Sequence, residues 1–308
     1  MGNNKIAIVG DPHIAPIPGG RIDDYFEVGL NKIQQIAQQC EHIVFLGDMF
    51  SCPKIDEKYV NRLISHLLYL QHVNGNKFYS IIGNHDVVSE LESKLSISSL
   101  GTLQASGCVQ IILPDKPIDI AGYTFNTVPV RYRDVKSFLQ SKTYTSKDIL
   151  LIHHEYETGT NKLTYEDLKN LGCKHIFFGH DHCPLPEGRI IYPEFTVYRS
   201  GSLMRNLATP YNFTRQIYYY ILDGSNISCG AIQQQPAQLV FTQKALTREN
   251  YNKKKFVESV DSIIDKYKST MSKQHKCSMK SALLELNTPD RCLARIEKKY
   301  QKFGERFD

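Results

Sequence analysis

An apolar run passes directly into a polar cluster in the stretch FYSIIGNHD, residues 78–86. The run 78–82 is short and rich in aromatic and β-branched residues, which is typical of a buried strand. Four other runs have the same character and also predict strands: 6–9, 43–46, 149–152 and 176–178. Helical spacing of apolar residues in 23–39 and 56–73 separates the first three strands. The resulting β-α-β-α-β order predicts an α/β layered fold.

Each of the five predicted strands ends in a polar cluster. The clusters are Asp11-Pro12-His13, Gly47-Asp48, Gly83-Asn84-His85-Asp86, His153-His154 and Gly179-His180-Asp181-His182. In open α/β sheets, ligands bind beyond the carboxyl ends of the strands. We therefore expect the five clusters to converge on one site.

The donor groups in these clusters indicate the chemistry of that site. Carboxylate, imidazole and amide donors suit divalent ions such as Mn²⁺, the ion we expect, with Fe²⁺, Zn²⁺ or Mg²⁺ as alternatives. Two ions about 3.5–4 Å apart need a shared anionic ligand, and they can activate a bridging water and clamp the oxygens of a phosphoryl group. Asp48, alone after Gly47, is the natural bridge. A single strand-end histidine or a Gly-Asp pair is usually only a surface or turn feature. Chance does not explain five such clusters at five successive strand ends.

In order, the blocks D-x-H, G-D, G-N-H-D, a strand-ending H and G-H-x-H resemble the signature of the calcineurin-like metallophosphoesterases. The resemblance implies a four-layer α-β-β-α sandwich with a small C-terminal helical extension. It also implies seven metal ligands, with Asp48 bridging the two ions: Asp11, His13 and His182 for the first ion, and Asn84, His153 and His180 for the second.

Two further residues of the third block resemble catalytic groups of that family. His85 matches a histidine that binds no metal and that protonates the leaving alkoxide or stabilises charge on the phosphoryl group. Asp86 is expected to orient the imidazole and raise its basicity. His154 is assigned a neighbouring, substrate-facing role. Cys183 lies beside His182, but no second cysteine is near enough for a closed structural zinc site. The exact roles of His154 and Cys183 stay open.

The blocks predict the reaction class better than the substrate. Phosphoprotein phosphatases of this type carry G-D-x-x-D-R-G and end the third block in Glu, whereas this chain has 47–52 as GDMFSC and has Asp86. The stretch 198–202, YRSGS, resembles the end of SbcD-type nuclease domains. This resemblance implies an exonuclease and endonuclease that acts in DNA recombination, repair or processing. A small-molecule or cyclic-nucleotide phosphodiesterase or phosphatase remains the alternative, and a non-catalytic scaffold is disfavoured by the intact ligand set.

The charge of the chain is uneven. Residues 244–308 carry 16 Lys and Arg against 9 Asp and Glu, whereas residues 1–243 carry 21 against 23. Apolar stripes from 256 to 271 and from 293 to 307 have helical spacing. We therefore predict a nuclease domain at 1–243 and a basic helical extension at 244–308. The extension resembles the segment with which SbcD-type nucleases bind the coiled-coil root of an SMC-like ATPase. The expected partners are DNA, that ATPase and a second copy of the chain.

The second half of the predicted domain changes character at about residue 193. From there to 241, four short runs separated by turn residues predict strands at 195–198, 216–222, 227–232 and 238–241, which together would complete a second sheet. No apolar run approaches the roughly 18 residues of a membrane span, and the first residues lack signal-peptide organisation. The eight scattered cysteines suit reduced thiols. We expect a soluble cytoplasmic protein, in the host cytoplasm if viral, with no membrane partner.

Overall fold

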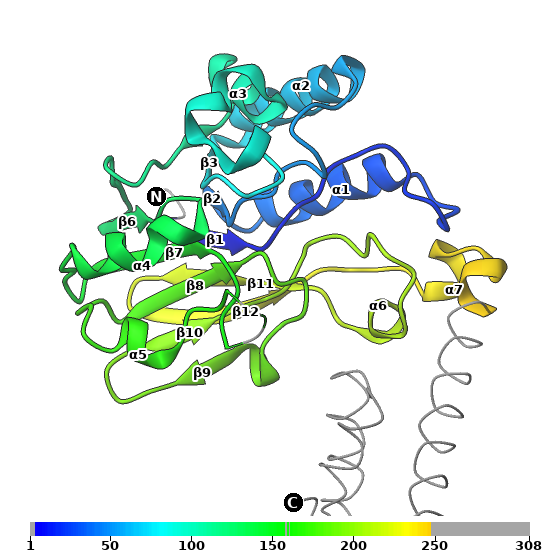
Figure 1. The fold of residues 1–308 in the computed structure, drawn as a ribbon. Helices are drawn as coiled ribbons and strands as arrows, with labels where there is room; N and C mark the ends of the chain where they lie inside the picture. Colours follow the sequence, from blue (N-terminus) through cyan, green and yellow to red (C-terminus); the bar gives the residue numbers. More distant parts are fainter. Residues whose placement is uncertain (1–3, 158, 160, 248–308) are drawn as a thin grey trace, which may run out of the picture. The chain divides into compact units, whose positions relative to one another are not determined.

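The structure is a computed structural model of the 308-residue chain, and it describes residues 4–157, 159 and 161–247. Residues Met1–Thr242 form one compact unit (Figure 1). The predicted extension at 244–308 lies almost wholly outside the described residues, so its helices and its role stay a prediction. Within the described part of the chain, no helix is both long and apolar enough to span a membrane.

Two mixed β-sheets form the centre of this unit. The first has the strand order β12-β11-β1-β2-β3-β4, with bounds Asn226–Ala231, Tyr218–Asp223, Ile6–Val9, His42–Phe45, Lys77–Ser80 and Gln110–Ile111. The second has the order β5-β6-β7-β8-β10-β9, with bounds Ile118–Ile120, Tyr123–Thr127, Asp148–His153, His175–Gly179, Thr196–Tyr198 and Arg189–Ile191. The neighbours β1, β2 and β3 are parallel, as are β6, β7 and β8. The carboxyl ends of these strands therefore share one edge in each sheet.

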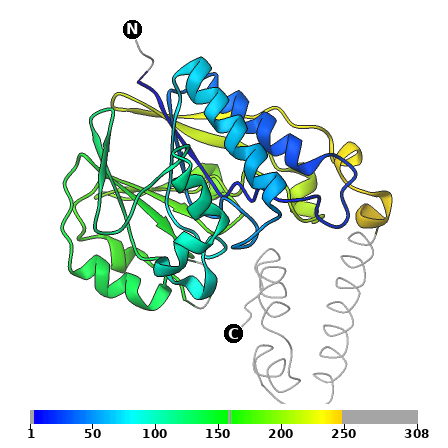
Figure 2. The ribbon, with the colours of Figure 1, turned by 90° about the horizontal axis from the view of Figure 1, so that it is seen from above.

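The longer helices begin and end where the sequence supplies caps. Helix α1 is Tyr25–Ala37. Asp24 directly precedes the helix, and its carboxylate accepts a hydrogen bond from the backbone N–H of Glu27. Helix α2 is Glu57–Asn74; the Asp56 carboxylate accepts from Lys58, and Gly75 ends the helix with a φ of 72°. Such side-chain caps satisfy backbone donors that the first helical turn leaves free. In Figure 2, α1 and α2 run side by side, joined by an ion pair between Glu27 and Arg62 at 2.8 Å.

The remaining elements are short. The helices are α3 (Ser99–Ala105), α4 (Tyr132–Gln140), α5 (Tyr165–Leu168), α6 (Pro210–Thr214) and α7 (Ala237–Val240). Short 3-10 helices occur at Val88–Glu90, Glu92–Ile97 and Pro186–Gly188.

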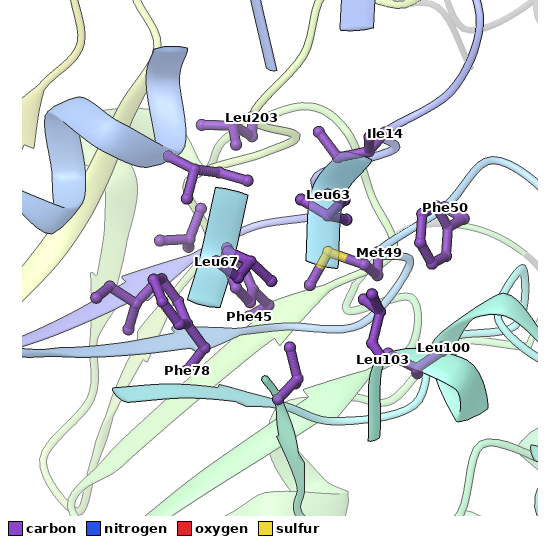
Figure 3. Packing of buried hydrophobic residues seen from close by; sticks show 14 of the residues in the cluster. Ile14, Phe45, Met49, Phe50, Leu63, Leu67, Phe78, Leu100, Leu103 and Leu203 are labelled. Atoms are coloured by element: carbon purple, nitrogen blue, oxygen red, sulfur yellow. The ribbon is translucent and has the colours of Figure 1, made fainter. Parts of the chain in front are cut away.

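Three hydrophobic clusters show that the elements form four layers. Between α1–α3 and the first sheet, Leu63, Leu67 and Leu103 pack with Phe45 and Phe78 (Figure 3). A second cluster lies between the two sheets, and a third lies between the second sheet and α4 and α5. Successive residues of a strand face opposite sides, and both sides of these strands are covered, which explains why the central runs are continuously apolar. The predicted α-β-β-α sandwich is confirmed.

The prediction for 193–241 needs correction. Its strands do not complete one further sheet, because β11 and β12 extend the first sheet beyond β1, while β10 pairs with β8 in the second. The predicted strand at 238–241 is instead the short helix α7. Pro236 immediately before it suits a helix start, since proline lacks the N–H that a ladder needs.

Candidate metal centre

The two sheets bring the predicted ligands to one place. Asp11 and His13 follow β1, Asp48 follows β2, and Asn84 follows β3. His153 is the last residue of β7, while His180 and His182 follow β8. The first sheet therefore supplies mainly oxygen donors, and the second supplies imidazole nitrogens.

Two aspartates and one histidine form the buried centre of the site. Ligand atoms of Asp11, Asp48 and His153 all lie within 4.8 Å of one another, which could hold a metal ion. His153 Nδ1 lies 3.5 Å from Asp11 Oδ1, and its Nε2 lies 3.3 Å from Asp48 Oδ2. Burial disfavours a charged imidazole here, but the Asp48 and Asp11 carboxylates outweigh it and raise the pKa of His153 to about 10.

The remaining predicted ligands lie in two groups on either side of Asp48. In one group, His13 Nε2 lies 2.8 Å from His182 Nε2 and 3.6 Å from Asp48 Oδ2. In the other, Asn84 Oδ1 lies 3.0 Å from His153 Nε2 and 2.9 Å from His180 Nδ1. The pairing of His13 with His182 and that of Asn84 with His153 and His180 follow the expected groups, whereas Asp11, expected with His13 and His182, lies beside His153. That these seven residues bind metal stays a prediction.

The backbone is unusual at four of the seven positions. Asp11, His13, Asp48 and His180 have φ values of 20°, 47°, 49° and 78°. Positive φ is uncommon for residues with a Cβ, and such strain clusters at functional sites. The surrounding hydrogen bonds hold these conformations: His13 N–H donates to the Asp48 carbonyl at 2.9 Å, and His180 N–H donates to Asp11 Oδ1 at 3.0 Å.

Glycines allow the strand ends to approach so closely. A Cβ at Gly83 would collide with the carboxylate and backbone of Asp48, and one at Gly179 would lie 2.7 Å from Asp11 Oδ1. A side chain at either position would push the carboxylates away from the imidazoles.

The electrostatics of the centre fit divalent cations. Burial and the nearby Asp48 raise the pKa of Asp11 to about 7, although His153 opposes the rise. Burial lowers the pKa of His13 to about 3 and that of His182 to about 4, so both imidazoles are neutral near pH 7. Asp11 Oδ2 and His13 Nδ1 are buried without a hydrogen-bond partner among the described residues. Unpaired buried carboxylate oxygens and neutral imidazoles are the donor set expected for ions such as Mn²⁺, Fe²⁺ or Zn²⁺.

His85 and Asp86 do different things from one another. His85 is exposed above the centre: its backbone N–H donates to Asp48 Oδ1 at 2.8 Å, and its Nδ1 lies 3.1 Å from the Ser51 carbonyl oxygen. Asp86 is buried, and its carboxylate accepts from the backbone N–H groups of Gly83 at 2.9 Å and Phe50 at 3.4 Å. Asp86 thus holds the loop that carries Asn84 and His85, and the Ser51 carbonyl is the hydrogen-bond partner of the imidazole. A catalytic role of Asp86 beside His85 stays a prediction.

A small hollow adjoins the second ligand group. Its volume is about 140 Å³, and it is lined by Asn84, His153 and His180 together with Glu90, Val130, His154, Glu155 and Asn161. His154 is buried, and its Nε2 lies 3.2 Å from the Pro129 carbonyl oxygen. Cys183 is exposed, and its backbone N–H donates to Asp181. Sequence reasoning missed Ser51, Glu90 and Glu155, because none of them belongs to a recognisable block.

The chain matches one protein family and is distantly similar to solved structures. A family model described as calcineurin-like phosphoesterase matches residues 4–184. One solved crystal structure is similar with a TM-score of 0.44 and 10% identity, covering 75% of this chain and 99% of that chain. The structure of vacuolar protein sorting 29 from Cryptosporidium parvum is similar with a TM-score of 0.34 and 12% identity, covering 75% and 98%. A search of curated proteins gave no match. None of these similarities names an SbcD-type nuclease.

Proposed function

The chain belongs to the calcineurin-like phosphoesterase family, and from this premise we propose that it is a two-metal phosphodiesterase that cleaves DNA, as the nuclease subunit of an SbcCD-like complex. The family makes the chain a metal-dependent hydrolase of phosphoesters. The choice of DNA and of a partner ATPase goes further. It rests on the resemblance of 198–202 and of the extension at 244–308 to SbcD-type nucleases, and on the exposure of the metal centre described below.

In this proposal the residues around Asp48 take separate roles. Asp11, His13 and His182 would hold one ion, Asn84, His153 and His180 would hold the other, and Asp48 would be shared by both. When bound, two divalent ions supply an activated water and clamp the phosphoryl oxygens. Mn²⁺ is favoured over Mg²⁺, because Mg²⁺ prefers water and oxygen ligands whereas four of the seven donors here are imidazoles.

His85 then acts on the substrate directly. Its ring lies close to that of His13, with centroids 5.4 Å apart, and its Nδ1 faces the Ser51 carbonyl. When Nδ1 donates to that oxygen, Nε2 is left to receive or deliver a proton at the phosphoester. A positioned acid or base of this kind contributes roughly 10²–10⁴-fold to the rate.

The observation that carries the choice of a polymeric substrate is the openness of the site. His85 is exposed, and the hollow beside the ligands has only about 140 Å³. Sites that enclose a small molecule usually have roughly 300–1,000 Å³. A nucleic-acid backbone could lie across such a surface and present one phosphodiester to the centre.

One feature favours the alternative, a small-molecule or cyclic-nucleotide phosphodiesterase. Glu90 and Glu155 line the hollow next to Asn84 and His180. Carboxylates repel the phosphates of a polyanion and can accept hydrogen bonds from a nucleobase. A compact nucleotide with one reacting phosphate would suffer less from this repulsion than a long strand.

A parallel assay separates the two candidates. The Mn²⁺-loaded protein is given linear duplex DNA, single-stranded DNA, a cyclic nucleotide and a generic aryl phosphodiester, with His85→Ala protein from the same preparation as control. We expect endonucleolytic cleavage of single strands and exonucleolytic cleavage of duplex ends that both fall in the control. Efficient turnover of the cyclic nucleotide without any DNA cleavage would reject the nuclease proposal in favour of the alternative.

The proposed partner contacts involve the residues after the compact unit. Residues 246–308 are proposed to bind an SMC-like ATPase and to add nonspecific DNA affinity through their basic side chains. Every predicted ligand lies before residue 183, so a chain ending at Ala245 should still hydrolyse the generic phosphodiester. Its salt-sensitive DNA binding and its capture of the ATPase should weaken, and unchanged binding of both would contradict this role.

A further inference from the structure

A second buried polar cluster lies away from the metal ligands. The cationic cluster consists of Arg21, Lys32, Arg205 and Arg215, each at most 8% exposed. The one carboxylate paired with it is Asp23, which accepts from Nε and Nη2 of Arg21. Among the described residues the cluster thus contains four cations and one anion. Burying a charge costs several kcal/mol per ion unless it is compensated, so the excess charge calls for an explanation.

Backbone carbonyls compensate part of this charge. Arg205 donates to the Asn212 carbonyl at 3.4 Å and to the Gln235 carbonyl at 2.7 Å. Arg215 donates to the Ser202 and Met204 carbonyls, both at 2.8 Å. Carbonyl oxygens are dipoles, so they satisfy hydrogen bonds without cancelling net charge.

Lys32 is the least satisfied member of the cluster. Its ammonium donates one hydrogen bond to another described residue, to the Leu203 carbonyl at 2.9 Å. An ammonium group has three donors, so two remain for another acceptor. Burial and the neighbouring Arg205 and Arg215 lower the pKa of Lys32 well below its usual value.

A cavity adjoins these groups. Its volume is about 150 Å³, several times the space that one water molecule needs. Arg21, Lys32 and Arg205 line it together with Asp23, and Gln35 and Gln234 are also among the lining residues. Guanidinium, ammonium and amide donors around one cavity are the groups that bind phosphate in proteins.

We propose that this cavity is a binding site for a phosphate-type oxyanion. The cluster has three more cations than carboxylates, so a dianion matches it better than a single carboxylate would. Free phosphate and the phosphate group of a nucleotide share this chemistry. The site uses none of the metal-ligand residues, and it stands independently of the proposed nuclease activity.

The loop that follows the second sheet connects this site to the metal centre. Leu203 N–H donates to the Gly10 and Asp11 carbonyls at 3.0 and 3.1 Å, while its own carbonyl accepts from Lys32. An anion that pairs with Lys32 would therefore hold the loop that touches the backbone of Asp11. Anion binding in the cavity should therefore raise the unfolding free energy of the whole compact unit.

The test measures phosphate binding to the full-length protein in the presence of a chelator, so that phosphate cannot bind through metal ions. Thermal unfolding is followed at constant ionic strength in a buffer of large organic anions, with increasing inorganic phosphate, and calorimetric titration gives the dissociation constant. Lys32→Met is compared with Lys58→Met, whose native side chain is 66% exposed on α2. Adenosine monophosphate replaces phosphate in a parallel series.

We expect saturable stabilisation by phosphate in the native protein and in Lys58→Met, and a dissociation constant weakened roughly tenfold or more in Lys32→Met. Without phosphate, Lys32→Met should be at least as stable as the native protein, because it removes an uncompensated buried charge. Binding of the nucleotide as well as phosphate would assign the site to a phosphate group of a larger molecule. The proposal is overturned if calorimetry shows no phosphate binding to the native protein, or if Lys32→Met binds phosphate as tightly as Lys58→Met does.

Discussion

The metal centre and the cationic cluster are buried polar regions of opposite charge, and the loop around Leu203 touches both. At the metal centre, Asp11 and Asp48 face His153, whose pKa they raise, and Asp48 also faces His13, whose pKa burial lowers. In the cationic cluster, four basic side chains face one carboxylate. Unpaired buried charge is expensive, so each region is built to receive a counter-ion, a cation in the first and an anion in the second.

The two regions differ in how the chain builds them. The metal centre takes its donors from five strand ends, and the strain of positive φ at Asp11, His13, Asp48 and His180 fixes their directions. The cationic cluster takes its donors from α1 and from loops, and its side chains bind the carbonyls of those loops. Rigid strand ends suit the fixed geometry of metal coordination, whereas long flexible side chains suit an anion that needs charge more than exact angles.

Removing the central carboxylate of the metal centre should have the largest effect. Asp48→Ala is expected to abolish phosphoester hydrolysis and to lose the bound metal, because Asp48 lies between both ligand groups. Metal analysis after dialysis and an assay with a generic phosphodiester measure the two losses together. Asp223→Ala, at a position with a 57% exposed side chain, is the matched control. Two metals retained in the Asp48→Ala protein would show that Asp48 is not the bridge.

Removing His85 should separate chemistry from metal binding. His85→Ala is expected to keep its metal content and to lose roughly 10²–10⁴-fold in turnover, the contribution of a positioned acid. His72→Ala, on the exposed surface of α2, is the control. If metal analysis finds fewer ions bound to His85→Ala than to the control, His85 is a ligand and the assignment fails.

The metal centre could be predicted from the sequence, but the cationic cluster could not. The metal centre could be predicted because each donor lies at or just after the end of a strongly apolar strand. The apolar run predicts the strand, and the adjacent polar cluster predicts the ligands. The helices with Asp24 and Asp56 at their starts were predictable for a similar reason, since cap and apolar stripe are adjacent. In the cationic cluster, by contrast, Arg21 and Arg215 are nearly two hundred positions apart, and no local pattern links them.

Other errors arose where tertiary contacts override local pattern. The alternating residues at 216–232 do form strands, but their pairing with β1 depends on which sheet edge is open, which the sequence does not state. The run at 238–241 is too short for periodicity to separate helix from strand. In the sequence, the adjacency of Asp86 to His85 suggests a contact, whereas in the structure the turn directs the Asp86 carboxylate to the backbone of Gly83 and Phe50.

A smaller effect should appear in stability rather than activity. Asp11→Asn keeps the Oδ1 acceptor for His180 but removes one of two neighbouring buried carboxylate charges. In chelator, the variant is expected to be at least as stable as the native protein. With Mn²⁺ at 100 times its dissociation constant, the native protein should gain about 2.7 kcal/mol that the variant lacks. Thermal unfolding with and without metal measures this difference, with Asp223→Asn as control; marked destabilisation of Asp11→Asn in chelator would mean that the protein itself uses the charge.

The last expected effect is a pH dependence of stability that arises in the cationic cluster, small over any one pH unit. Because burial and the neighbouring guanidinium groups lower the pKa of Lys32, the folded protein holds this proton less tightly than the unfolded chain does. Stability must then rise with pH until the unfolded lysine also loses its proton near pH 10.5, by at most about 1.4 kcal/mol per pH unit.

The difference in unfolding free energy between the native protein and Lys32→Met isolates this contribution, since all other titrating groups are shared. That difference should move in favour of the native protein as pH rises above neutrality in phosphate-free buffer. Saturating phosphate should flatten the trend, because an anion beside Lys32 favours its charged form. A difference that does not change with pH, or that changes equally with and without phosphate, would contradict the excess of buried positive charge on which the comparison of the two regions rests.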